Sequence, residues 1–394
     1  MPEAVAREHE LVLFGATGFT GRLTAEYLAR HAPPGLRWAL AGRNRSKLER
    51  VREELTAADR SLEELPLLHA DADDPPSLRR IASSTRVVAT TVGPYALYGE
   101  PLVAACAAAG TDYVDLSGEP EFVDRVWLAY HEQAKRSGAR IVHSCGFDSI
   151  PYDLGVLFTV LRLPEGVPIT VKGYWRAGAS FSAGTYRSTI HALARVRRSA
   201  ALAARRRRLE PQPPGRRVRG LSGPPRWDAD AGHWVVALPT IDPQHVLRSA
   251  RALERYGPDF SYGHYLIVGG PLRLVAFAVG ATTLFALAQV QPARDFLLGL
   301  KQPGEGPSAE RRARSWFRVI FVGSGGGRRV VTQVSGGDPG YGETSKMLAE
   351  SALCLARDEL PPVAGQVTSA VAMGERLIER LVRAGIRFEV VEGG

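Results

Sequence analysis

Residues 11–21 read LVLFGATGFTG, an apolar run that ends in three glycines at three-residue intervals. The run predicts a buried strand, and the glycines predict a tight turn that leads into a helix. Gly15 and Gly18 would let backbone amides approach a pyrophosphate without an intervening Cβ, and Gly21 would let the helix pack closely on the strand. Because a helix N-terminus favours an anion, the stretch predicts a dinucleotide-binding unit at the start of the chain.

The first half of the chain repeats one pattern of strand and helix. Short apolar runs alternate with stretches of helical spacing, and prolines, glycines or capping residues such as Ser46 delimit the helices. Six such strands predict an α/β fold with a parallel, doubly wound Rossmann sheet. The expected strands are 11–14, 37–41, 67–71, 86–94, 113–116 and 140–143, and the expected helices are 22–31, 46–56, 74 onward, 101–109 and 121–137.

Side chains at the carboxyl ends of these strands indicate the cofactor. Arg43 follows the second strand, where an acid would bind the ribose 2′-hydroxyl of NAD, and an arginine there suits the 2′-phosphate of NADP. Asp71 is expected to contact an adenine edge, and the end of the fourth strand is expected beside the nicotinamide ribose. The candidate cofactor-binding residues are Gly15, Thr17, Gly18, Phe19, Thr20, Gly21, Arg43, Asn44, Asp71, Thr91, Val92, Gly93 and Pro94.

The composition is that of a folded protein with two domains. A chain of 394 residues is long for one compact core, and hydrophobic and charged fractions of 45% and 23% exclude a disordered chain. The three cysteines are scattered and form no CxxC pair, so neither a disulfide framework nor a metal site is expected. Charged residues before the first strand leave no room for the apolar core of a signal peptide. We therefore expect a cytoplasmic protein.

The net charge of +9 is concentrated in one segment. Residues 194–219 contain ten arginines and a single acid, Glu210, while the rest of the chain is balanced. Such a run is most often a solvated face or a mobile loop. The alternative is a patch that binds an acidic partner or anionic lipid headgroups. A nucleic-acid partner is not expected, because no aromatic residues interleave the arginines.

The second half mixes strands and helices, as in an α/β or α+β domain. Residues 145–155 are expected to connect the two domains, with Asp148 and Ser149 capping a helix that starts near Pro151; capping is favoured over catalysis for Asp148. The expected strands are 167–177, 234–238, 262–268, a hairpin of 316–322 with 328–334, and a final strand at 386–391 that adds to a sheet. The expected helices are 180–208, 343–357 and 370–383.

An apolar stretch at 274–293 carries no charge over about 20 residues, the length that can cross a bilayer. Threonines, glutamines and a proline interrupt it, and no second stretch of this kind accompanies it. We expect a buried helix that lines an acyl pocket or forms a dimer contact. Shallow membrane association is the alternative.

Several motifs together identify a family. They are GATGFTG at 15–21, AGRN at 41–44, VGPY at 92–95, YGEP at 98–101, DYVDLSGE at 112–119, CGFDSIPYDLG at 145–155, GEGPS at 304–308 and GGDPGYGETSKMLAESA at 336–352. These motifs resemble the saccharopine dehydrogenase-like oxidoreductases over nearly the whole chain except the arginine-rich segment. Within that family the chain is similar to the bacterial trans-acting enoyl reductases, which reduce a carbon–carbon double bond in an acyl chain built by a polyketide synthase lacking that activity.

The resemblance implies an NADPH-binding Rossmann domain and an α/β domain that supplies much of the substrate cleft. We place these domains at 1–150 and 151–357, with an arginine-rich insert at 195–219. We expect 358–394 to form a helix and a strand that pack back on the Rossmann domain. The implied substrate is a small-molecule or carrier-bound acyl thioester, and the implied partner is a polyketide synthase carrier protein. A homo-oligomer is also expected.

The implied reaction needs a hydride from NADPH at the β-carbon of an unsaturated thioester and a proton at the α-carbon. Tyr95 and Tyr186 are candidate proton donors, and Lys346 is a candidate for polarising the carbonyl. Tyr152 and Tyr341 are further candidate donors. Two rival functions stay open: a non-catalytic NADPH-binding sensor or scaffold, and a lipid-surface protein that uses the arginines and the apolar stretch.

Overall fold

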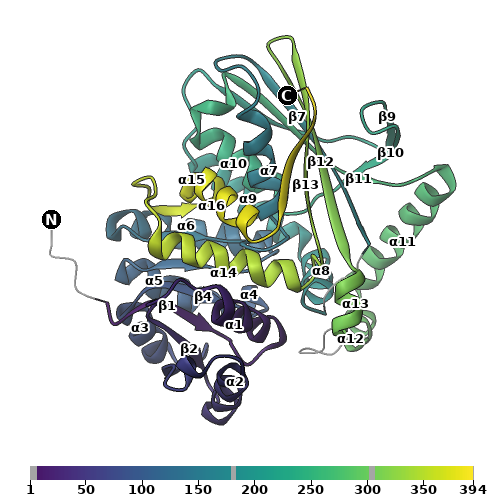
Figure 1. The fold of residues 1–394 in the computed structure, drawn as a ribbon. Coiled ribbons are helices and arrows are strands. Elements are labelled where there is room, and N and C mark those ends of the chain that lie inside the picture. Colours follow the sequence, from purple (N-terminus) through teal and green to yellow (C-terminus); the bar gives the residue numbers. More distant parts are fainter. Residues whose placement is uncertain (1–6, 179–182, 301–306, 394) are drawn as a thin grey trace. The chain divides into compact units, whose positions relative to one another are not determined.

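The computed structural model describes residues 7–178, 183–300 and 307–393 (Figure 1). The chain divides into two compact units. Unit 1 comprises Met1–Ser117, Phe122–Gly146 and Tyr341–Arg380. Unit 2 comprises Gly118–Glu121, Phe147–Gly340 and Leu381–Gly394. The expected helix start at 180–182 and part of the GEGPS motif, 304–306, lie outside the described residues.

Unit 1 is built on a parallel sheet of seven strands in the order β14-β6-β5-β4-β1-β2-β3. The order reverses direction between β1 and β4, which is the switch point of a doubly wound sheet. The predicted fold class is therefore confirmed, including all six predicted strands. The strands are β1 (His9–Phe14), β2 (Trp38–Gly42), β3 (Leu67–His69), β4 (Thr85–Thr90), β5 (Asp112–Val114), β6 (Arg140–Val142) and β14 (Gly365–Val367).

The helices of unit 1 follow the predicted alternation, with corrections at their ends. The fourth strand ends at Thr90, not Pro94, because α4 begins at Tyr95. Asn44, not Ser46, caps α2, since its Oδ1 accepts the Lys47 amide at 2.9 Å. The helices are α1 (Phe19–His31), α2 (Arg45–Ala58), α3 (Pro75–Ser84), α4 (Tyr95–Tyr98), α5 (Glu100–Ala109), α6 (Pro120–Ser137), α14 (Gly342–Arg357), α15 (Ser369–Ala372) and α16 (Gly374–Arg383).

The carboxyl-terminal part of the chain returns to unit 1 earlier than expected. Residues 341–380 belong to unit 1, although the second domain was expected to extend to 357. The reason is that α14 packs on α1, β1, β4 and β5, with Met347, Leu348 and Leu353 fully buried. Ion pairs add to this packing, because Arg380 binds Glu350 at 3.1 Å.

Unit 2 is built on an eight-stranded mixed sheet in the order β15-β13-β12-β7-β11-β10-β9, with β8 also paired to β11. β7 pairs parallel with β11 and antiparallel with β12. The predicted hairpin and the predicted final strand are both present, as β12 with β13 and as β15 on β13. The expectation that this strand packs on the Rossmann domain is wrong, because its pairing with β13 places it in unit 2. The strands are β7 (Ile169–Gly178), β8 (Arg217–Leu221), β9 (Arg226–Asp228), β10 (His233–Ala237), β11 (Asp259–Ile267), β12 (Trp316–Gly325), β13 (Arg328–Gly336) and β15 (Arg387–Glu392).

The helices of unit 2 show two further corrections. The helix expected through 208 is divided at Arg195 into α8 and α9. The apolar stretch forms α11 and α12, and most residues of both helices are exposed. The expectation of a buried helix is therefore wrong. Only one stripe of α11 faces the protein, where it packs along α8. The helices are α7 (Ile150–Val160), α8 (Ala183–Ala194), α9 (Val196–Leu209), α10 (Asp242–Ala252), α11 (Pro271–Gln289), α12 (Gln291–Gly299) and α13 (Ala309–Arg314).

The arginine-rich insert is in part a folded segment and not a mobile loop. Arg206 is buried and pairs with Glu210, whose other oxygen accepts Arg248 Nε at 2.9 Å. β8, within the insert, places Arg217 and Arg219 on Asp259 at 2.8 and 2.9 Å. The desolvation free energy that burial costs the Arg206 guanidinium is offset by its ion pair with the Glu210 carboxylate. The exposed arginines of α9 are Arg197, Arg198, Arg205, Arg207 and Arg208.

Candidate functional site

The glycine turn of unit 1 joins β1 to α1 in the way the sequence predicts. Gly15 has φ +93°, a left-handed conformation that favours glycine. Gly18 is the N-cap of α1, and its missing side chain leaves the first turn without a side-chain cap. The first amides of an α-helix have no intrahelical acceptor. The turn thus presents backbone donors and the positive end of a helix dipole, which together suit a pyrophosphate.

Gly21 and Gly18 differ in what surrounds them. A Cβ on Gly21 would lie 2.1 Å from the Gly15 carbonyl oxygen and 2.8 Å from Thr91 Oγ1, so only glycine fits there. A Cβ on Gly18 would meet only the Gly15 oxygen, at 3.5 Å, an ordinary contact. Packing within the chain therefore accounts for Gly21. The open space at Gly18 is what a closely approaching ligand would use.

The ends of neighbouring strands lie beside this turn, because β1 pairs with both β2 and β4. After β4, Thr91 donates its hydroxyl to the Gly15 oxygen at 3.1 Å. A Cβ on Gly15 would lie 2.8 Å from the side chain of Val92. The structure therefore brings one group of predicted residues together at the switch point: Gly15, Thr17, Gly18, Phe19, Thr20, Gly21, Thr91, Val92, Gly93 and Pro94.

Arg43 stands out among the cations at the end of β2. Its side chain is exposed and has no ion pair or hydrogen bond within the part of the chain that the structure describes. Arg45, by contrast, binds Glu49 and the Leu67 carbonyl oxygen, each at 3.0 Å. A guanidinium without a partner at this position fits the 2′-phosphate of NADP.

Two other predicted cofactor residues have local structural partners. Asn44 uses its side-chain oxygen as the cap of α2. Asp71 lies beyond β3, which ends at His69 and not at Asp71 as expected, and its Oδ1 accepts the amide of Asp73 at 3.2 Å. Both residues stay at the carboxyl edge of the sheet, next to Arg43, since β2 pairs with β3.

The three predicted catalytic side chains are held by internal partners. In unit 1, the buried Tyr95 hydroxyl donates to the Thr90 carbonyl oxygen at 3.1 Å and accepts the Leu116 amide at 3.2 Å. Also in unit 1, Lys346 Nζ pairs with Glu343 at 2.8 Å. In unit 2, Tyr186 donates to the Leu297 carbonyl oxygen at 3.0 Å. Tyr341, a further candidate, is buried against the ring of Phe19, with 4.8 Å between centroids.

Unit 2 contains an acidic cluster of Asp148, Tyr152, Asp242 and His264. The sequence did not predict that these residues lie together. The expected capping role of Asp148 is wrong: Ser149 is the N-cap of α7, which has no side-chain cap. Asp148 is half-buried against Gly118, where a Cβ would lie 3.2 Å from its Oδ2. Within the described residues, its carboxyl group has no hydrogen bond or ion pair.

Burial sets the protonation of this cluster. It raises the pKa of Asp148 from 3.8 to about 6. It also raises the pKa of Asp242 well above its ordinary value, with the nearby Asp148 charge adding to the effect. Burial lowers the pKa of His264 to about 3, so this imidazole is neutral. Its Nε2 lies 3.8 Å from Asp242 Oδ2, which is too far for a hydrogen bond between the two.

Aromatic rings surround the cluster. Tyr152 meets His264 edge-on with 4.8 Å between centroids, and Phe147 meets Tyr152 at 5.6 Å. Phe147 also contacts Trp175, whose buried Nε1 has no hydrogen-bond partner among the described residues. An apolar wall around a carboxyl group of raised pKa is the kind of environment in which enzymes hold a general acid.

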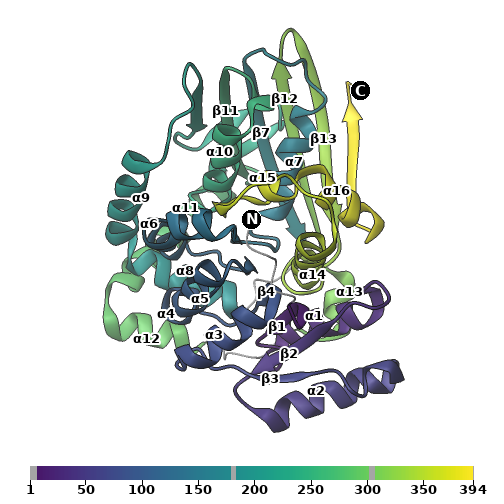
Figure 2. The same cartoon turned by 90° about the vertical axis from the view of Figure 1, so that its left-hand side faces the viewer.

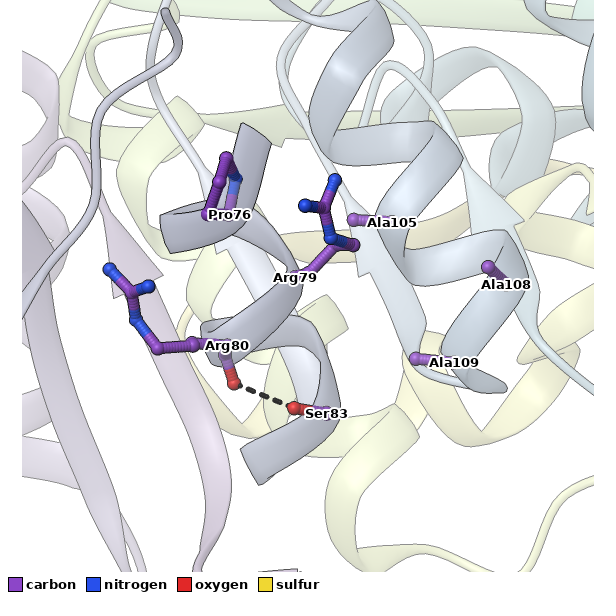
Figure 3. Close-up of a pocket in the computed structure, with 7 residues that line it drawn as sticks. All are labelled: Pro76, Arg79, Arg80, Ser83, Ala105, Ala108 and Ala109. Atoms are coloured by element: carbon purple, nitrogen blue, oxygen red, sulfur yellow. Dashed lines mark hydrogen bonds between the residues drawn. The ribbon is translucent and has the colours of Figure 1, made fainter. Parts of the chain in front are cut away.

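Figure 3 shows an open hollow elsewhere in unit 1, between α3 and α5. Ser83 and Ala109, in the last turns of these helices, lead into the amino ends of β4 and β5. The hollow therefore lies toward the edge of the sheet opposite the glycine turn and is not part of the cofactor site. It is lined by Pro76, Arg79, Arg80, Ser83, Ala105, Ala108 and Ala109.

Unit 1 thus has the features of an NADP-binding Rossmann domain. A family model described as the saccharopine dehydrogenase NADP binding domain matches residues 11–142. A Mycobacterium tuberculosis protein provisionally named a trans-acting enoyl reductase is 40% identical, over 98% of this chain and 98% of its own. The trans-acting enoyl reductase of Mycobacterium ulcerans is 35% identical, over 96% and 97% of the two chains.

The similarity extends to solved structures at the level of the fold. Apo saccharopine dehydrogenase (L-Glu forming) from Saccharomyces cerevisiae aligns with a TM-score of 0.57 and 11% identity, over 98% of this chain and all of that one. The protein belongs to the saccharopine dehydrogenase-like family, together with these trans-acting enoyl reductases. It is an NADP-dependent oxidoreductase.

Proposed function

We propose that this protein reduces the double bond of an α,β-unsaturated acyl thioester, presented by the carrier protein of a polyketide or lipid synthase. NADPH, when bound, supplies a hydride for the β-carbon. The chain has to bind the cofactor and to provide a proton for the α-carbon. The cofactor features of unit 1 and the full-length relatives named as enoyl reductases support the proposal.

The observation that carries the chemistry is the half-buried carboxyl group of Asp148. We infer that the protonated Asp148 gives its proton to the α-carbon and becomes a carboxylate. Its partial exposure then allows solvent to return the proton. The reaction is balanced, because the saturated product gains one hydride from NADPH and one proton from Asp148. Tyr95 is a weaker candidate, since two backbone groups already bind its hydroxyl.

The direct test follows NADPH absorbance with an unsaturated acyl thioester of pantetheine, alone and on a carrier protein. We expect oxidation of NADPH, a saturated product by mass spectrometry, and a higher kcat/KM with the carrier-bound substrate. The matched saturated thioester should give no oxidation. Tight binding of NADPH without oxidation of any unsaturated thioester would instead support a sensor or scaffold. Cytoplasmic location and a homo-oligomeric state stay predictions, to be checked by fractionation and light scattering.

Arg43 provides a test of the cofactor site that does not depend on the substrate. Replacing Arg43 with alanine should weaken NADPH binding about tenfold to a hundredfold, since one charge-assisted contact to phosphate contributes about 1.5–3 kcal/mol. Affinity for NADH should change little, because it lacks the 2′-phosphate. Fluorescence titration with both nucleotides measures this. Arg45→Ala is the matched control, and equal affinity of the parent for both nucleotides would exclude this role.

A further inference from the structure

The helix α11 exposes apolar side chains on the face turned away from the protein. It is 19 residues long, and its most apolar window of 18 residues has a mean hydropathy of 1.7 and is only 6% buried. The inward stripe consists of half-buried Leu274, Phe277 and Leu284 and buried Ala288. A surface helix normally has polar residues on its outer face, so the outer face of α11 needs another explanation.

The outer face of α11 forms an apolar ridge in its first half. Leu272, Val275 and Val279 are exposed by 87%, 61% and 62%, and their spacing places them on one side of α11; Val290, just after the helix, is exposed by 55%. Phe296 of α12, which packs against α11, adds a further apolar side chain exposed by 70%. Contiguous exposed apolar surface of this kind marks an interaction site rather than ordinary surface.

The connections of α11 and α12 limit what the ridge can contact. α11 follows β11, and the chain after α12 and α13 returns to β12, while both strands pair with β7. A single crossing of a bilayer would place β11 and β12 on opposite sides, although they belong to one sheet. α12 has 9 residues and is too short to cross back. The ridge can therefore enter a bilayer only from one side, at the depth of the interface.

The charge around the ridge selects an anionic surface. α11 and α12 pack on α8, and α8 packs on α9; Figure 2 shows α8, α9 and α12 on the same side of unit 2. These four helices contain nine arginines, of which Arg206 is buried, and one acid, Asp295. In a two-fold contact with a second copy, the same basic surface would face itself, which is repulsive. Anionic lipid headgroups attract it instead.

We propose that the apolar ridge of α11 and α12 docks this protein on an anionic lipid bilayer, with the arginines of the surrounding helices at the headgroups. Leu272, Val275 and Val279 enter the boundary of the acyl chains, and unit 2 stays outside the bilayer. Such docking would bring a lipid-like acyl substrate and the protein to one surface. The docking itself does not rest on the proposed enzymatic function.

Vesicle flotation of the full-length protein tests the proposal, with vesicles of about three parts phosphatidylcholine to one part phosphatidylglycerol and with phosphatidylcholine alone. We expect binding to the anionic vesicles, weakened by salt. Val275→Glu with Val279→Glu should lower the bound fraction at least about tenfold, because charged groups replace apolar ones at the interface. Arg205→Gln with Arg208→Gln should lower the preference for anionic vesicles about fivefold or more.

Val391→Glu is the matched control, because Val391 is exposed by 61%, as Val275 is, but lies on β15. It should bind vesicles like the parent. All variants should keep the parent's unfolding temperature and NADPH affinity. Three outcomes would overturn the proposal: a parent that binds neither vesicle, a ridge variant that floats like the parent, or a ridge variant that only converts a dimer to a monomer or only weakens carrier-protein binding.

Discussion

Replacing Gly21 with alanine is expected to destabilise unit 1 by about 3 kcal/mol and to weaken NADPH binding at least about a hundredfold. The new Cβ would lie 2.1 Å from the Gly15 carbonyl oxygen, a backbone atom that already accepts the Gly18 amide and the Thr91 hydroxyl. The clash can be relieved only by moving the turn away from α1. The amides that would face the pyrophosphate then lose their positions. Thermal unfolding and NADPH titration measure the two effects.

Gly18→Ala is the control for this prediction. Its Cβ would have only a contact of 3.5 Å within the chain, so the free energy of unfolding should change by less than about 1 kcal/mol. NADPH affinity should still fall, because the methyl group would occupy space that the ligand approaches. The prediction fails if Gly21→Ala binds NADPH as the parent does, or if Gly18→Ala unfolds as easily as Gly21→Ala.

The fold of unit 1 could be predicted because its signals are local. Each of the six predicted strands is a short apolar run, and each is separated from the next by a helix with its own boundaries. The seventh strand, Gly365–Val367, is three residues with a glycine and a glutamine, and it carries no such signal. It becomes a strand only because the edge of β6 accepts it. The placement of α14 in unit 1 is likewise a property of tertiary packing.

The candidate cofactor site of unit 1 and the acidic cluster of unit 2 differ in the same way. The glycine turn and Arg43 lie within one strand–helix–strand segment, so spacing along the chain predicts their proximity. Asp148, Asp242 and His264 are far apart in sequence, and the folding of unit 2 brings them together. The capping prediction for Asp148 is wrong by one residue. A cap at Asp148 requires the helix to start at Ser149, but α7 starts at Ile150, so Ser149 is at the N-cap position.

Hydropathy identifies the apolar stretch at 274–293, but it does not show what covers this stretch in the folded protein. A run of this composition is compatible with a buried helix, a dimer contact or a membrane contact, because all three remove apolar surface from water. Only the neighbours of α11 distinguish them. α8 covers one stripe, and the described part of the chain leaves the other side exposed. The arginine-rich insert shows the opposite error. Its composition predicts a solvated charge at Arg206, but this side chain is buried and pairs with Glu210.

Replacing Asp148 with asparagine is expected to lower kcat/KM for the unsaturated thioester by about a hundredfold or more, the usual contribution of a general acid. NADPH affinity should stay unchanged. In the parent, kcat/KM should fall as pH rises through about 6, because Asp148 then loses the proton that it donates. The variant should lose this part of the pH profile. Steady-state kinetics with a carrier-bound substrate from about pH 4.5 to about pH 8, roughly one and a half to two units either side of this pKa, would measure it.

The same substitution should increase stability. The folded pKa of Asp148 lies above its unfolded value of 3.8, so between that value and about 6 the native state binds more protons than the unfolded state. The parent therefore loses stability as pH rises through this window, and Asp148→Asn removes the loss, a gain of about 2–3 kcal/mol above pH 6. Asp242→Asn is the control, because asparagine resembles the neutral acid that burial favours there. It should retain most of the activity. If Asp148→Asn keeps the parent's rate and pH profile, another group supplies the proton.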